Sequence, residues 1–237
     1  MIRLDKFLAD CGKGTRREVR NYIKAGRVRV DGNPIKDIGF KFDENVAEVT
    51  FDGVLLSFDR FRYYMLNKPA GVVSATKDNL SDTVLDILKD EVTKNCFPVG
   101  RLDKDTEGLL LITNDGTLSH ELLSPKKHVE KEYIAVSDVT LSADGLRQFA
   151  AGLDIGDDTV TLPAVIEPFD CDNANGYKVI IHEGRYHQVK RMFEAVGGHI
   201  IALKRVRMGE LRLDDTLAPG EYRKLTPDEI ALLKGER

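Results

Sequence analysis

Three carboxylates that could do chemistry stand close together near the middle of the chain. They are spaced two residues apart: Asp103, Asp105 and Glu107. Such a group can bind a cation, transfer protons or supply a nucleophile. A calcium loop that began at Asp103 would need Glu at its twelfth position, which is Asn114, and residues 109–113 have the composition of a buried strand instead. Spacing alone leaves two interpretations, a surface loop with ion pairs to Arg101 and Lys104 or a reactive loop.

A second polar group lies on a predicted helix at residues 186–196. The apolar face of this helix contains Val189, Met192, Phe193 and Val196. Lys190 lies on the flank of that face, where its stem can cover apolar surface while its ammonium reaches a site. From the pattern alone it could equally be an ordinary surface lysine. His187, His182 and His199 show no metal-ligand spacing, so no metal site is expected.

Charge is distributed unevenly along an acidic protein. The 237 residues carry a net charge of -4, yet residues 1–36 carry +6 and residues 184–208 carry +5. Such asymmetry indicates that particular surfaces bind a polyanion, although the overall charge argues mildly against one. For any single basic helix, the alternative to polyanion binding is an ordinary charged surface exposed to solvent.

The elements that must present these charges begin with two helices. Leu4, Phe7, Leu8 and Cys11 follow a helical repeat, and Thr15 with Glu18 forms a capping box for a second helix. Strands are predicted at 27–30, 46–50 and 54–56. A domain boundary is expected near residues 57–62, so that the domains are 1–58 and 62–237.

The second domain has short apolar strands with helices interspersed. Strands are predicted at 63–66, 72–75, 109–113, 133–137, 164–167, 177–182 and 200–207. Helices are predicted at 83–88, 118–123, 143–152, 186–196 and 227–233. Strands and helices do not alternate regularly, which indicates the α+β class with a mostly antiparallel, mixed sheet flanked by helices.

The remaining composition narrows the class of protein. Cys11, Cys96 and Cys171 are far apart and form neither a zinc motif nor a disulfide framework. The first ten residues carry charges where a signal peptide needs an apolar run, and no stretch is long enough to cross a bilayer. We expect a cytoplasmic protein without a membrane partner, and a monomer.

The first domain resembles the S4 RNA-binding module. The resemblance lies in Arg-Leu-Asp-Lys-Phe-Leu-Ala, the Thr-Arg-Arg helix and Gly-Arg-Val-x-Val-Asp-Gly, over about residues 2–38. Guanidinium groups grip phosphate oxygens, and each bound cation releases counterions. The resemblance implies that structured RNA is held by Arg3, Arg16, Arg17, Arg20 and Lys24.

The second domain resembles the RsuA-type pseudouridine synthases. The motifs are Gly-Arg-Leu-Asp and Asp-Thr-x-Gly-Leu-Leu-Leu-Ile-Thr-Asn-Asp-Gly from residue 100, Lys-Pro-x-Gly at 68–71, Lys-Glu-Tyr at 131–133 and the run 183–193. The resemblance implies that Asp103 is the nucleophile, that Lys190 keeps it ionised and that Tyr133 stacks on the target uracil. It also makes candidate RNA contacts of Arg101, Arg185, His187, Gln188 and Arg191.

Pseudouridine formation isomerises a uridine without redox change, so no cofactor is expected. The target base must leave its stack to reach the site. Residues 185–193 resemble the small-subunit branch of the family, which implies 16S ribosomal RNA as partner, naked or in a partly assembled small subunit. Two alternatives remain: the same chemistry on 23S ribosomal RNA, or a ribosome-associated RNA-binding protein without activity. A glycosidase is disfavoured because no second acid pairs convincingly with Asp103.

Overall fold

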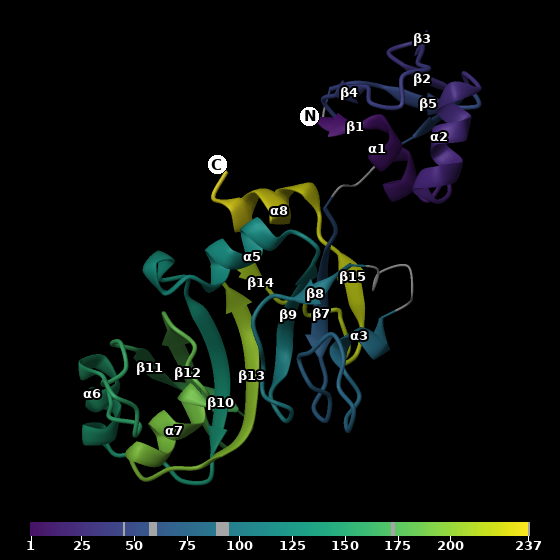
Figure 1. Ribbon diagram of the computed structural model, residues 1–237. Helices are drawn as coiled ribbons and strands as arrows, with labels where there is room; N and C mark the ends of the chain where they lie inside the picture. The colour runs from purple at the N-terminus through teal and green to yellow at the C-terminus, as the bar shows by residue number, and fades with distance from the viewer. Residues whose placement is uncertain (45, 57–60, 89–94, 172–173, 237) are drawn as a thin grey trace. The chain divides into compact units, whose positions relative to one another are not determined.

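The computed structural model describes residues 1–44, 46–56, 61–88, 95–171 and 174–236. The chain divides into two compact units, Met1–Arg60 and Phe61–Arg237 (Figure 1). The boundary expected near residues 57–62 falls mostly on residues 57–60, which lie outside the described part. Each unit has a hydrophobic core of its own.

The first unit has two short helices against small antiparallel sheets. Its elements are β1 (Ile2–Arg3), α1 (Leu4–Asp10), α2 (Arg16–Lys24), β2 (Val28–Val30), β3 (Asn33–Pro34), β4 (Lys41–Phe42), β5 (Val49–Phe51) and β6 (Val54–Leu56). One sheet has the order β3-β2-β5-β6, and β1 pairs with β4. The predicted capping box is confirmed, since Thr15 Oγ1 accepts from the Glu18 amide and the Glu18 carboxylate accepts from the Thr15 amide. The helices bury Leu4, Leu8 and Ile23 against the strands.

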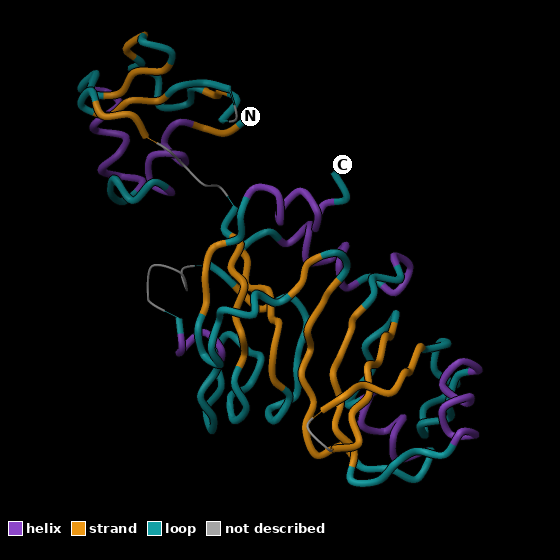
Figure 2. The backbone as a smooth tube through the Cα atoms, turned by 180° about the vertical axis from the view of Figure 1, so that it is seen from behind, coloured by secondary structure: helices purple, strands orange, loops and turns teal. Residues whose placement is uncertain are grey.

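The second unit is built on one large mixed sheet, seen from behind in Figure 2. Its strands are β7 (Tyr63–Lys68), β8 (Phe97–Pro98), β9 (Glu107–Thr113), β10 (Lys131–Ser137), β11 (Val165–Cys171), β12 (Ala174–Ile181), β13 (Ile200–Met208), β14 (Leu211–Arg212) and β15 (Tyr222–Lys224). The main order is β11-β12-β10-β13-β9-β7-β15, with β14 beside β13 and β8 beside β9. Only β13 and β9 pair in parallel among the described strands, so the predicted α+β class with a mostly antiparallel sheet is confirmed.

Helices cover both faces of this sheet. They are α3 (Val84–Ile87), α5 (Gly116–Leu123), α6 (Ala143–Ala151), α7 (Gln188–Ala195) and α8 (Pro227–Lys234), with a 3-10 turn η1 (Pro125–Lys127). Leu110 and Ile112 of β9 pack in the core shared with α3, α6 and α7, whereas Leu109 and Leu111 pack in the core shared with α5 and α8. A strand buried on both faces needs a continuous apolar run, which explains the leucines after the acidic cluster.

A glycine allows β9 to approach β13. Gly108 has φ +98°, and a Cβ atom there would lie 2.2 Å from the Arg205 carbonyl oxygen. Any other residue would push the parallel strands apart, since L side chains disfavour this conformation and the space is filled by backbone. Gly108 thereby fixes the position of the acidic loop that precedes β9.

Several predicted elements have other bounds in the structure, and two of these differences bear on the site. Residues 72–75 form only an isolated bridge from Val73 to Thr83 rather than a strand, and the Ser74 side chain there bonds to the backbone of Leu102. Helix α7 begins at Gln188 instead of 186, since His187 adopts the left-handed conformation with φ 49°.

Candidate active site

Asp103 and Asp105 lie in the loop between β8 and β9, and Glu107 is the first residue of β9. Buried polar side chains hold this loop. Lys68, at the end of β7, is fully buried and donates to the carbonyl oxygens of Pro69 at 3.0 Å, Lys104 at 3.2 Å and Thr106 at 2.8 Å. Ser74 Oγ donates to the Leu102 carbonyl and accepts from the Leu102 amide. These bonds anchor the backbone on both sides of Asp103.

The Asp103 carboxylate faces two side chains from the start of α7. His187 Nε2 lies 3.5 Å from Oδ1 of Asp103, and Lys190 Nζ lies 3.7 Å from Oδ2. Lys190 makes its closer contact with Asp105, at 2.5 Å, and this hydrogen bond lowers the pKa of the Asp105 carboxyl. The lysine is therefore shared between two carboxylates, one of which is largely exposed.

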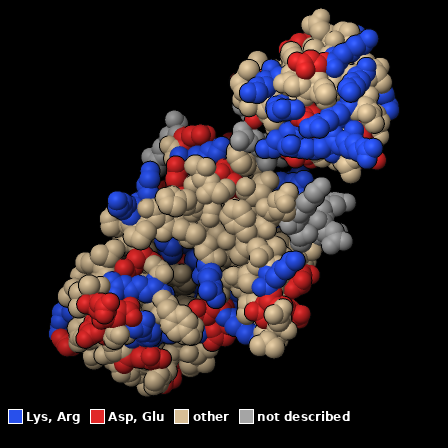
Figure 3. All heavy atoms as spheres, in the orientation of Figure 1, with Lys and Arg blue, Asp and Glu red and all other residues tan. Residues whose placement is uncertain are grey.

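Asp103 opens into a cleft of about 710 Å³ in the second unit. Its lining includes Arg101, Lys131, Tyr133, Tyr186, His187 and Arg205. A smaller recess shares Asp103 and Tyr133 with the cleft. Apolar side chains, among them Ile181, Val189 and Leu203, line it together with polar ones such as Arg185, His187 and Gln188. The face of this unit seen in Figure 3 is hollowed, and lysine and arginine atoms lie near the hollow. The cleft thus combines a carboxylate, aromatic rings and cations, with a recess of mixed polar and apolar lining beside them.

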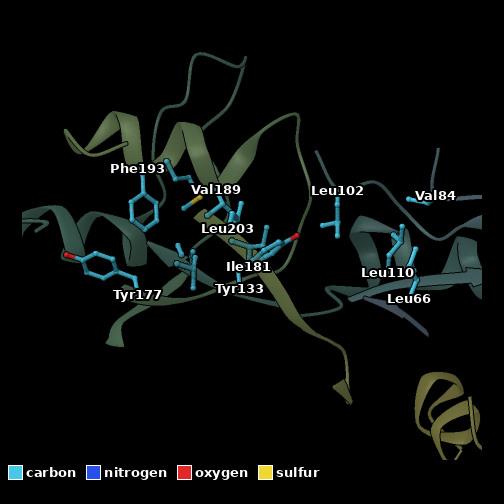
Figure 4. Close-up of a cluster of buried hydrophobic side chains, with 14 of the residues drawn as sticks. Leu66, Val84, Leu102, Leu110, Tyr133, Tyr177, Ile181, Val189, Phe193 and Leu203 are labelled. Carbon is cyan, nitrogen blue, oxygen red and sulfur yellow. The ribbon is translucent and has the colours of Figure 1, made fainter. Parts of the chain in front are cut away.

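Tyr133 joins the hydrophobic core to the cleft. It comes from β10, is 7% exposed and lies beside Ile181, Val189 and Leu203 (Figure 4). Its hydroxyl makes no hydrogen bond among the described residues and points toward the side of Leu102 in the close-up. Because Tyr133 lines the cleft, this hydroxyl is available to a ligand there.

The turn before α7 places two rings at the cleft. The Tyr186 ring stacks on the His187 ring with centroids 3.9 Å apart and an angle of 16° between the planes. Tyr186 is 76% exposed, whereas His187 reaches Asp103. The left-handed backbone of His187 is uncommon for a non-glycine residue and is concentrated at functional sites.

The other RNA contacts predicted in this unit fall into two groups. Arg101 is exposed, lines the cleft and has no ion pair or hydrogen-bond partner within the described residues. Arg185 and Arg191 instead bond to Asp157 and to backbone carbonyls, and Gln188 is buried with its amide on Glu183. Internal bonds therefore occupy these three side chains.

In the first unit the predicted RNA-binding cations also fall into two groups, those without a partner among the described residues and those bonded to a carboxylate. Arg16, Arg17 and Lys24 on α2 are exposed and have no partner in the described part of the unit. Arg3 and Arg20 bond to the fully buried Asp5 at 3.0 and 3.1 Å. Burial raises the pKa of the Asp5 carboxyl, but the hydrogen bonds from Arg3 and Arg20 outweigh it and hold the pKa below its ordinary value. Lysine and arginine atoms crowd the face of this unit seen in Figure 3.

Sequence reasoning assigned no role to three buried cations. Lys68 and Lys131 stand inside quoted motifs, Lys-Pro-x-Gly and Lys-Glu-Tyr, and Arg205 lies in the second basic segment. All three are buried, which is unusual for these residue types and could not be read from spacing. Their presence in short motifs was the available signal.

One unit has a cleft with a carboxylate, a tyrosine and cations that lack a carboxylate partner among the described residues, and the other unit exposes basic side chains. This combination is typical of an enzyme that acts on nucleic acid. No described helix is both long and apolar enough to cross a membrane. Residues 62–195 match the family model described as RNA pseudouridylate synthase, and residues 2–46 match the S4 domain model. The chain belongs to the RNA pseudouridine synthases, a family of isomerases, and carries an N-terminal S4 domain.

Several proteins resemble the chain over nearly its whole length. An uncharacterized RNA pseudouridine synthase YtzG of Bacillus subtilis (strain 168) is 47% identical, with 98% of each chain covered. The ribosomal small subunit pseudouridine synthase A of Yersinia pestis is 45% identical, with 97% of each covered. A crystal structure of a pseudouridylate synthase is 36% identical with a TM-score of 0.70, covering 98% of this chain and all of that one.

Proposed function

We propose that this protein isomerises a specific uridine of 16S ribosomal RNA to pseudouridine, with Asp103 as the nucleophile. The observation that carries the proposal is the Asp103 carboxylate at the cleft, with Lys190 and His187 within 4 Å of its two oxygens and Tyr133 in the same lining. The 45% identity to a small subunit pseudouridine synthase A favours the 16S target.

The reaction needs one bond broken and one formed. The bond between uracil N1 and the ribose C1′ breaks, the base turns, and C5 bonds to C1′, while the proton on C5 leaves and N1 regains one. Asp103 supplies the ionised carboxylate that stabilises or captures the electron-poor centre. Lys190 and His187 orient this carboxylate, and Lys190 places a positive charge 3.7 Å from one of its oxygens.

The recess and cleft suit an extruded nucleotide. Apolar Ile181, Val189 and Leu203 beside Tyr133 offer a flat base a surface on which to stack. Tyr133 has a free hydroxyl for proton transfer, and Arg101 at the rim holds the backbone of the flipped nucleotide. The S4 domain binds the phosphate backbone of structured RNA through its exposed cations Arg16, Arg17 and Lys24, and this binding is independent of base sequence.

We further propose that the protein acts as a monomer in the cytoplasm on ribosomal RNA, naked or within a partly assembled small subunit. No cofactor enters the proposed reaction, because substrate and product are isomers. Internal bonds of Arg185, Arg191 and Gln188 favour a role in shaping the cleft over direct contact with RNA.

The test is tritium release from ribosomal RNA labelled at uridine C5. The purified protein should release tritium from 16S RNA and not from 23S RNA, and sequencing should map the product to one uridine. Release from 23S RNA alone would reassign the target. Binding without release from either RNA, free or in assembling particles, would leave only the non-catalytic RNA-binding alternative.

A further inference from the structure

Two buried cations line the cleft next to Tyr133. Arg205 on β13 is 2% exposed and Lys131 on β10 is 7% exposed. Arg205 lies opposite Tyr133 in the antiparallel pairing of β13 with β10, and Lys131 lies two residues before Tyr133 on the same strand. Both side chains line the larger cleft. A sheet presents alternate residues on one face, so the three belong to one surface.

Neither cation has a carboxylate partner within the described residues. Arg205 Nε donates to the Leu109 carbonyl at 2.8 Å, while Nη2 is buried without any hydrogen-bond partner. Lys131 Nζ donates only to the Val129 carbonyl, at 2.9 Å. Buried guanidinium and ammonium groups are costly unless they are paired, so this arrangement is incomplete without an anion.

The surroundings of Lys131 strengthen this conclusion. Burial and the charge of Arg205 lower the pKa of Lys131 to about 8, although Glu183 acts in the opposite direction. The Glu183 carboxylate is occupied by the Leu162 amide, Arg185 and Gln188. Two cations thus repel one another across the floor of the cleft, and an anion placed between them would relieve that repulsion.

We propose that Lys131 and Arg205 form a subsite for a phosphodiester group of the RNA, beside the recess that receives the target base. The inference rests on the proposed function and specifies how that site holds its substrate. Arg205 and Lys131 line the larger cleft but not the recess, which favours the backbone over the uracil as their ligand. A planar guanidinium matches phosphate oxygens, and charge-assisted bonds are the strongest available.

The test compares uridine with uridine 5′-monophosphate and uridine 3′-monophosphate as ligands of the full-length protein. By calorimetry or NMR titration, at least one nucleotide should bind about ten-fold more tightly than uridine, since a charge-assisted bond contributes on this order. In Arg205→Met and Lys131→Met that preference should fall to about two-fold or less, and Arg205→Lys should keep part of it. Arg147→Met on α6, an exposed arginine that bonds to Asp144, is the matched control and should keep the full preference.

Circular dichroism and thermal unfolding check that each variant is folded. The wild-type comparison needs no variant, so equal affinity for uridine and both nucleotides would overturn the subsite even if Arg205→Met misfolds. Equal loss of uridine and nucleotide affinity in a folded Arg205→Met would assign the side chain to the base and would also overturn it.

The outcomes separate the subsite from the proposed function. A phosphate preference that depends on Arg205, in a protein that forms no pseudouridine, supports the subsite and refutes the enzyme assignment. Pseudouridine formation without a phosphate preference refutes the subsite alone.

Discussion

The ammonium nitrogen of Lys190 lies 3.7 Å from Oδ2 of Asp103, and the two residues come from different elements of the second unit. Asp103 stands in the loop before β9, and Lys190 stands in the first turn of α7. The loop is fixed by Lys68 and Ser74, while the helix is fixed by its apolar face. The distance is therefore set by the packing of the whole unit.

Replacing Asp103 with Asn should abolish isomerisation and leave RNA affinity within about two-fold, because the carboxylate acts on the reacting atoms more than on binding. The loss should be on the order of 10⁴-fold or more, as for other nucleophiles. Tritium release and filter binding on the same RNA measure the two effects. Full turnover in Asp103→Asn would refute the nucleophile assignment.

Lys190 contacts both Asp103 and Asp105, so substitutions of Lys190 and of Asp105 should have different effects on turnover. Lys190→Met should slow turnover about 10²- to 10³-fold, because Asp103 loses its nearest cation, and Lys190→Arg should retain more activity than Lys190→Met. Asp105→Asn, which removes the closer partner of Lys190, should keep turnover within about ten-fold, since Lys190 can then turn fully to Asp103. Single-turnover rates at saturating protein measure all three. A larger loss in Asp105→Asn than in Lys190→Met would place the working ion pair at Asp105 instead.

Neutralising exposed cations of the S4 domain should weaken RNA binding without stopping chemistry. For Arg16→Gln, Arg17→Gln and Lys24→Gln together, the slope of log affinity against log salt should become shallower by about 0.7 to 0.9 per lost phosphate contact. Arg147→Gln on α6, which removes one exposed positive charge outside the S4 domain, is the control and should leave the slope unchanged. An unchanged slope in the triple variant would show that α2 does not meet the backbone.

Arg20 should behave differently from its neighbours on α2. It bonds to the buried Asp5, so Arg20→Gln leaves that carboxylate with only Arg3 and should destabilise the first unit by about 1 to 3 kcal/mol. The pKa of Asp5 is held below its ordinary value, so its contribution to stability is present above that value and is lost as the pH falls through the lowered one. Thermal unfolding at neutral and acidic pH should show a smaller difference between wild type and Arg20→Gln at acidic pH. An equal difference at both would contradict the ion pair.

Lys131 should titrate far below an ordinary lysine. Burial and the neighbouring Arg205 lower its pKa from 10.5 to about 8, so the folded protein loses this proton while the unfolded chain still holds it. Between these two values the unfolded state binds more protons, and this group's contribution to the free energy of unfolding rises with pH. NMR of lysine side chains gives the pKa directly, with Lys131→Met identifying the signal. A midpoint near 10.5 would contradict the burial.

Sequence patterns by themselves determined the class of fold, the capping box of α2 and the family. Helical and strand periodicity, turn residues and contiguous motifs are local, so they can be recognised without coordinates, as Thr15 with Glu18 and the leucines of β9 show. Only the tertiary structure decided which charges meet. It placed Lys190 closer to Asp105 than to Asp103 and paired Arg3 and Arg20 with Asp5. It also buried Lys131 and Arg205 with no carboxylate partner in the part of the chain that the structure describes. Burial and pairing depend on chain segments far apart in sequence, and these come together only when the strands pair in the folded sheet.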